Sequence, residues 1–418
     1  MMEILSTGQK IKRARIYKGI TLKELCKDKI SISKMSCIEN GKVKADSETI
    51  KYISEIIGVD FDYLMQDIYE QIVSNLESIK KDKYTEKELE DNIGINLSYA
   101  IEYDYNNLAL ELVHILFKYY LDNKKYDKCE GLISKYYAIY ENYNSDEATL
   151  VYYTDLAEYL VDKEEYYEAI VYYSRLREAN IVDIEKSFKE YSKVVCREAI
   201  CYYMLKDYNN AYELLKKIIK IEDQECEVPE AYEYYAATCI MLGFKEIDKN
   251  IDIFCKLVGE DKNKKAMAQL EFANAYFRTK DFANAEKTLE EALENFSKDN
   301  LEERVNFINE CIGILLDNGE SEKAYSLIEG NLNNAISTDD IKLIERSYYL
   351  KGMALKDLNR LNEAEMYLNL SLDSLYKFGT KKERHDRYLD LGYLYYEVGE
   401  LKDAIKYFNF AMDIEKEM

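Results

Sequence analysis

One spacing of about 40 residues restricts the fold of this chain more than any other feature. Small residues recur as anchors at Cys129, Ala169, Ala211, Ala285, Ala324, Ala364 and Ala404. The intervals between them are 40, 42, 74, 39, 40 and 40 residues, and the interval of 74 divides in two if a degraded unit lies near Ile247. A Tyr or Leu stands nine residues before each anchor, from Tyr120 to Tyr395. A fixed period in a helical pattern predicts stacked helix pairs, that is, a solenoid.

The unit is clearest at 269–293, where two amphipathic segments are joined by the tight connection 278–281. Small anchors let paired helices approach closely, and rings fill the space between units. The order of Ala/Gly and aromatic positions resembles the tetratricopeptide repeat, although these units are longer. The resemblance implies an all-α fold, with a right-handed superhelical solenoid of about nine pairs following an N-terminal domain. A plain helical bundle with chance periodicity is the alternative.

Charge divides the chain into two parts. Residues 1–66 contain 12 Lys/Arg and 9 Asp/Glu, so they carry +3. The whole chain has 57 Lys/Arg and 80 Asp/Glu, which leaves 45 and 71 for the remainder, or −26. An acidic body of this size repels nucleic acid, whereas the basic head does not.

The sequence contains no motif typical of a catalytic site. Nine cysteines show no zinc spacing, and most read as buried free thiols in a reducing cytoplasm. We expect no signal peptide, no membrane span, no metal site and no cofactor. His114 and His385 are the two histidines, and neither belongs to a catalytic motif. We therefore expect a cytoplasmic protein that is not an enzyme. A ligand-binding role for His114 stays open beside a structural one.

The sequence pattern predicts a separate helical module over residues 8–65. We expect helices over Gly8–Tyr17, over Leu22–Lys27 with Thr21 as its cap, from Ser31 to Glu39, and over Ser47–Ile57. Asn40-Gly41 provides the stop signal after the third helix. A further helix over Asp67–Lys83 and a capping box at Thr85 follow.

The module resembles the helix-turn-helix domain of the lambda-repressor/Xre family, through IKRARIYKGITLKEL, the segment ending in IENGK, and IIGVDFDYL. The resemblance implies that 32–38 is the recognition helix, with base-facing positions Ile32, Ser33, Lys34, Ser36 and Cys37. Thr21, Lys23, Asn40, Lys42 and Lys44 would approach phosphates, as would Arg13 or Arg15. Few of these side chains read bases bidentately, so dimerisation and DNA shape would supply much of the specificity. The alternative is a module that has lost DNA binding.

A second set of positions follows from tetratricopeptide geometry. Residues 18, 15, 11 and 7 before an anchor point toward the inner face, which gives Asn274, Arg278, Asn306, Asn309, Arg346, Tyr349, Met353 and Tyr393 as candidate peptide-binding residues. The same rule gives Thr154, Glu158, Lys193 and Ile200 in earlier units. An asparagine amide both donates and accepts, so it can hold a peptide backbone whatever the side chains are.

A head of this type before such repeats resembles the RRNPP family of peptide-responsive quorum-sensing transcription regulators, in length most like its NprR/PlcR branch. The resemblance implies a cytoplasmic regulator of a Gram-positive bacterium, homodimeric through its repeats, that binds double-stranded DNA and an imported signalling peptide. Its domains would be 1–66 (helix-turn-helix), 67–100 (linker helices or an irregular first repeat) and 101–418 (peptide-binding repeats). The alternative is an adaptor or phosphatase-type protein that binds a sporulation response regulator, with the head secondary.

Overall fold

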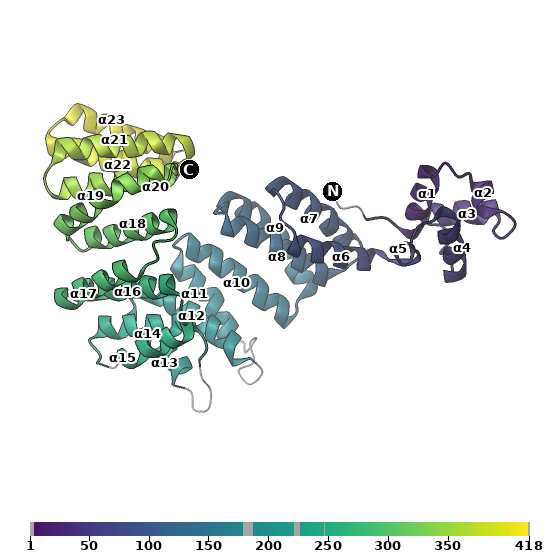
Figure 1. The fold of residues 1–418 in the computed structure, drawn as a ribbon, viewed down its shortest axis with the longest axis horizontal. Coiled ribbons are helices and arrows are strands. Elements are labelled where there is room, and N and C mark those ends of the chain that lie inside the picture. Colours follow the sequence, from purple (N-terminus) through teal and green to yellow (C-terminus); the bar gives the residue numbers. More distant parts are fainter. Residues whose placement is uncertain (1–3, 179–186, 221–225, 246, 417–418) are drawn as a thin grey trace. The chain divides into compact units, whose positions relative to one another are not determined.

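The computed structural model describes residues 4–178, 187–220, 226–245 and 247–416. All regular secondary structure in these ranges is helical, so the expected all-α, tetratricopeptide-like fold is confirmed. The chain divides into two compact units, Met1–Cys201 and Tyr202–Met418. Figure 1 shows the helices of each unit in chain order.

The first unit opens with a small helical head. Its helices are α1 (Thr7–Tyr17), α2 (Leu22–Cys26), α3 (Ile32–Glu39), α4 (Ser47–Ile57) and α5 (Phe61–Met65). Thr21 and Ser31 cap α2 and α3 as expected, and Gly41 takes the left-handed conformation just after α3 with φ 71°. Helices α2 and α3 therefore begin at their expected caps, and α3 ends at its expected stop signal.

The head has its own apolar core. Ile11, Leu25, Met35 and Ile53 meet there, all fully buried. A Cβ atom on Gly8 would lie 2.1 Å from the carbonyl oxygen of Ile38, so only glycine lets α1 pack this closely on α3.

Repeated helix pairs make up the rest of the first unit. They are α6 (Ile68–Lys81) with α7 (Glu86–Glu102), α8 (Asn106–Asp122) with α9 (Tyr126–Tyr143), and α10 (Asp146–Asp162) with α11 (Tyr166–Glu178). Helix α12 (Phe188–Met204) begins in this unit and contains the boundary with the second.

The second unit continues the same pattern. Its helices are α13 (Tyr208–Ile219), α14 (Pro229–Leu242), α15 (Asp248–Val258), α16 (Lys262–Arg278), α17 (Phe282–Asn295), α18 (Leu301–Asp317), α19 (Ser321–Ser337), α20 (Ile341–Asp357), α21 (Leu361–Phe378), α22 (Lys381–Val398) and α23 (Leu401–Glu415). Pro229 occupies the first turn of α14, as expected. Within the described residues, α6 to α23 make nine pairs, in agreement with the expected number.

The anchors occupy one structural position. Each, from Cys129 to Ala404, is the fourth residue of the second helix of its pair, and none exceeds 2% exposure. The degraded unit is the exception. Ile247 precedes α15 instead of lying inside it, and Asn250 is the residue buried near the helix start. The later start of α15 moves the anchor register, so the expected position of this anchor was wrong.

The connection inside each pair repeats as well. The residue five positions before the anchor has a positive φ, as at Lys280 (φ 62°), Glu164 (φ 62°) and Gly399 (φ 91°). The next N–H then donates to the carbonyl of the residue nine before the anchor, as from Asp281 to Tyr276 at 2.9 Å. This six-to-one hydrogen bond closes the helix end and reverses the chain.

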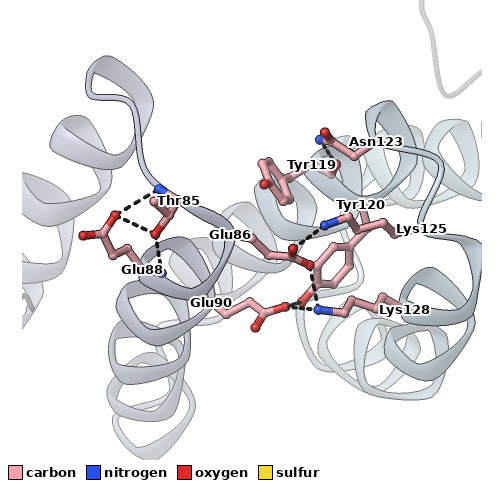
Figure 2. A network of polar contacts seen from close by, with 9 residues as sticks. All are labelled: Thr85, Glu86, Glu88, Glu90, Tyr119, Tyr120, Asn123, Lys125 and Lys128. Atoms are coloured by element: carbon pink, nitrogen blue, oxygen red, sulfur yellow. Dashed lines mark hydrogen bonds and ion pairs between the residues drawn. The ribbon is translucent and has the colours of Figure 1, made fainter. Parts of the chain in front are cut away.

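Polar contacts also join successive pairs, as Figure 2 shows for the first two. Lys128 Nζ lies 2.7 Å from Glu86 and 2.6 Å from Glu90, and Lys125 also pairs with Glu86. The Tyr120 hydroxyl donates to Glu90 at 2.7 Å. These bonds connect α7 with α8 and α9, so the head-proximal pair is fixed to the next one.

Candidate functional site

Helix α3 has one buried and one open face. Met35, Ile38 and Glu39 face the head interior, whereas Ile32, Ser33 and Lys34 are exposed. Ser36 and Cys37 are half-buried. The five residues expected to face bases therefore reach the surface to different degrees, and those at the N-terminal end of α3 are the most open.

Of the residues expected to approach phosphates, all except Arg15 are exposed, and some also have local partners. Lys23, Lys42 and Lys44 lie at the surface. The Thr21 hydroxyl donates to Glu24 at 2.8 Å, and the Asn40 side chain donates to the carbonyl of Ser36 at 2.8 Å. Thr21 and Asn40 thus shape the ends of α2 and α3.

Arg15 has a structural role. Its guanidinium donates to both carboxylate oxygens of the buried Glu39, at 2.6 and 2.9 Å, and to the carbonyl of Ile20. This bidentate pair holds α1 against α3, and it raises the pKa of Arg15. The expected phosphate contact from Arg15 would require this pair to break.

Two neighbouring cavities lie on the first helices of the pairs in the first unit. One, of about 250 Å³, is lined from α8, α10 and α12 by residues that include His114, Thr154, Lys193 and Arg197. The other, of about 390 Å³, includes Lys118, Glu158, Arg197 and Ile200. The inner-face rule named Thr154, Glu158, Lys193 and Ile200, and all four line these cavities.

The charges in these cavities are largely paired. His114 Nδ1 lies 2.6 Å from Asp155 Oδ2, and the Tyr136 hydroxyl donates to the same oxygen at 2.7 Å. Glu158 pairs with Lys118 at 2.5 Å and also with Arg197. Because Asp155 is buried, its two hydrogen bonds replace the water that a carboxylate needs.

The second unit contains a larger cavity, of about 450 Å³, with an acidic lining. Glu233, Glu303, Asn306 and Glu310 contribute to it together with apolar groups such as Phe307. The Asn306 amide donates to Glu310 at 3.0 Å. Asn306 is thus the expected peptide-binding residue that this cavity includes.

Three carboxyl groups on the first helices of this unit are held in their neutral form more readily than usual. Burial raises the pKa of Glu233 to about 8, and the nearby charges of Glu271 and Glu230 add to the effect. Desolvation also raises the pKa of Glu271 and, although its side chain stays exposed, of Glu310, and Tyr203 and Asn306 oppose these shifts by donating hydrogen bonds.

The remaining expected peptide-binding residues are placed differently. Arg278, Arg346 and Tyr393 are exposed, and Met353 is half-buried. The Asn274 side chain is buried, and its oxygen accepts from Asn318 at 3.2 Å.

Two others are held by neighbours. Tyr349 lies under the Arg387 guanidinium, 3.4 Å from the ring centroid. Asn309 is 1% exposed, and its oxygen accepts from Asn331 and Ser347. The expected open position of Asn309 is wrong, because α19 and α20 cover it.

The inner-face rule did not include one recurring position. An acidic residue stands 14 before the anchor in several units, namely Asp155, Glu271, Glu310 and Asp390. Two of these line the described cavities, Asp155 and Glu310. The signal was present in the same 40-residue register.

The comparisons with known proteins agree with the fold. The tetratricopeptide repeat family matches residues 268–299 and 345–374, which correspond to α16–α17 and α20–α21. No curated protein matches the chain in sequence. Within the described residues, no helix combines the length and apolarity needed to cross a membrane.

Three solved structures are similar to the chain. Aspartyl phosphate phosphatase F of Bacillus subtilis has 14% identity and a TM-score of 0.47, over 99% of this chain and 96% of that one. The quorum sensor NprR of B. thuringiensis, in its apo form, has 14% identity and a TM-score of 0.42, over 84% and 100%. PlcR of Bacillus thuringiensis, solved with the peptide PapR7 and DNA, has 13% identity and a TM-score of 0.36, over 91% and 98%.

Proposed function

We propose that this protein is a cytoplasmic transcription regulator of a Gram-positive bacterium. Its head binds double-stranded DNA, and a short imported peptide bound by its repeats changes that binding. The observation that carries the proposal is the open face of α3, with Ile32, Ser33 and Lys34 exposed over a closed apolar core. A helix presented in this way is the element that helix-turn-helix proteins place in the major groove.

The charge distribution supports the same role. The head is positive and the rest of the chain strongly negative, so electrostatics would orient the head toward phosphates. Lys23, Lys42 and Lys44 are exposed around α3 and supply the positive charge close to it.

The cavities support peptide binding. They lie on the first helices of the pairs, hold about 250 to 450 Å³, and combine polar with apolar lining. Cavities of this size suit a few side chains of an extended peptide.

Selection from a random duplex pool tests DNA binding. The full chain should enrich one sequence motif, and Lys34→Ala should weaken binding to it about tenfold. Lys51→Ala, on α4, is the matched control and should leave affinity within about twofold. Absence of any enriched motif would contradict the proposal.

A shift assay on the selected duplex tests the coupling. The peptide encoded in a small neighbouring reading frame should change the duplex affinity, and Asn306→Ala should weaken the response. Asn333→Ala, at an exposed position of the second helix α19, should not. DNA binding that is identical with and without the peptide would remove the coupling.

A homodimer through the repeats is part of the proposal. The last pair exposes Tyr396, Leu401 and Ile405, each about 60% accessible, which is unusual for side chains of this kind. Sedimentation of Leu401→Glu with Ile405→Glu should give a monomer where the unmodified chain gives a dimer.

The alternative function is binding of a response regulator by the repeats alone. Capture of a response regulator that survives deletion of 1–66 would favour this alternative over the DNA-binding role.

A further inference from the structure

The smaller cavity of the first unit contains a histidine that the sequence left unassigned. His114 projects from α8 into a space of about 250 Å³ that Thr154 and Asp155 of α10 and Lys193 and Arg197 of α12 also line. Its side chain is 36% exposed, whereas that of Asp155 is 3% exposed. The imidazole therefore stands between a buried carboxylate and an open cavity.

The hydrogen bonds define which ring nitrogen carries the proton. A carboxylate oxygen only accepts, so the Tyr136 hydroxyl at 2.7 Å and His114 Nδ1 at 2.6 Å both donate to Asp155. In the tautomer whose single ring proton is on Nδ1, Nε2 is an acceptor. Asp155 and Tyr136 thus act as positioning residues for His114.

The charged groups around the cavity already satisfy one another. Lys193 Nζ lies 2.7 Å from Glu190, and Arg197 pairs with Glu158. Within the described part of the chain, His114 Nε2 and the Thr154 hydroxyl have no hydrogen-bond partner. An uncharged ligand with an N–H donor and an oxygen acceptor would fit these two groups.

Apolar groups complete the lining. Leu150, Val151 and Val194 face the same cavity. They suit a small aliphatic side chain next to a polar backbone. An uncharged amide unit of an extended peptide offers this combination, since its N–H and C=O stand beside each side chain.

We propose that His114 Nε2 accepts a hydrogen bond from a backbone N–H of the bound peptide, while the Thr154 hydroxyl donates to a backbone carbonyl. The apolar lining takes the small aliphatic side chain of that unit. This inference rests on the proposed peptide binding by the repeats, and it names the contact and the peptide feature that the first unit recognises.

The test uses the full chain with ¹⁵N-labelled histidine. Only two histidines are present, so His385 serves as the internal reference. The probe is capped trialanine, acetyl-Ala-Ala-Ala-methylamide, at millimolar concentration. We expect the Nε2 resonance of His114 to move while that of His385 stays. A probe with N-methylated amides, which has no backbone N–H, should bind about tenfold more weakly.

A variant of Asp155 should change which ring nitrogen of His114 carries the proton. In Asp155→Asn the new amide can donate to Nδ1, which places the proton on Nε2 and removes the acceptor. Affinity for capped trialanine should fall about tenfold, with helix content unchanged by circular dichroism. Thr154→Val keeps the shape of the residue and should weaken binding about fivefold.

Three outcomes would overturn the inference. They are an unmoved His114 resonance, equal binding of the two probes, and tighter binding of acetate than of capped trialanine, which would indicate an anion site. None of these readouts involves DNA. Failure of the DNA response would therefore count against the proposed regulation and leave this contact standing.

Discussion

The two units differ in the surroundings of the carboxyl groups that stand at the same position of the repeat. In the first unit, Asp155 lies 14 residues before its anchor and accepts hydrogen bonds from His114 and Tyr136. In the second unit, Glu271 and Glu310 occupy that position, and desolvation raises the pKa of both. The repeat therefore places a carboxyl group on the first helix of the pair. The neighbouring side chains determine how many hydrogen-bond donors that carboxyl group has.

This difference suggests a division of tasks. A compensated carboxylate fixes other side chains, as Asp155 fixes His114. Glu271 accepts a side-chain hydrogen bond from Tyr203 at 2.7 Å, and Glu310 accepts one from Asn306 at 3.0 Å. Each of these carboxyl groups can accept a further hydrogen bond from a ligand.

The largest expected effect is on the compensated carboxylate. Asp155→Ala leaves the buried Tyr136 hydroxyl without its acceptor, so we expect the free energy of unfolding to fall by about 3 kcal/mol. Glu310→Ala, in the second unit, should cost less than about 1 kcal/mol. Urea denaturation monitored by circular dichroism measures both. Equal losses would mean that the two carboxyl groups are held alike.

The next effect is on pH dependence. Burial raises the pKa of Glu233 from 4.5 to about 8, so between these values the folded chain holds a proton that the unfolded chain releases. Stability of the second unit should therefore fall as pH rises through this window, by about 1 kcal/mol for each pH unit. Glu233→Gln should flatten the dependence. Thermal unfolding between pH 5 and about 8 measures it, and a slope unchanged by the substitution would refute the assignment.

The smallest effect concerns the turns, in which the units should behave alike. Glu164 and Lys280 both have φ 62°, one in each unit. Replacing either by glycine relieves left-handed strain and should stabilise its unit by about 1 kcal/mol. Gly399→Ala, with φ 91°, should destabilise by a similar amount. Melting temperatures measure all three, and unequal gains at Glu164 and Lys280 would show that neighbours matter here too.

The sequence was sufficient for features that depend on one residue and its place in the repeat. Ala285 had to be small because two backbones meet there, and it is fully buried. Thr21 and Ser31 cap their helices because the cap is a local hydrogen bond.

Features that depend on a third helix could not be predicted in this way. Asn309 has the spacing of an inner-face residue, but Asn331 on α19 and Ser347 on α20 enclose it. Ile247 failed as an anchor because α15 starts at Asp248. The hydrogen bond of His114 could not be predicted either, because its partner Asp155 lies 41 residues away in the sequence. Tyr136, which donates to the same carboxylate, lies 19 residues from Asp155.

The central claim is that peptide binding by the repeats and DNA binding by the head are energetically linked. Titration calorimetry on the full chain measures the peptide affinity with and without the selected duplex, and the duplex affinity with and without the peptide. Linkage requires the two ratios to be equal, and we expect each to exceed about fivefold. Affinities that do not change in either direction would contradict the account.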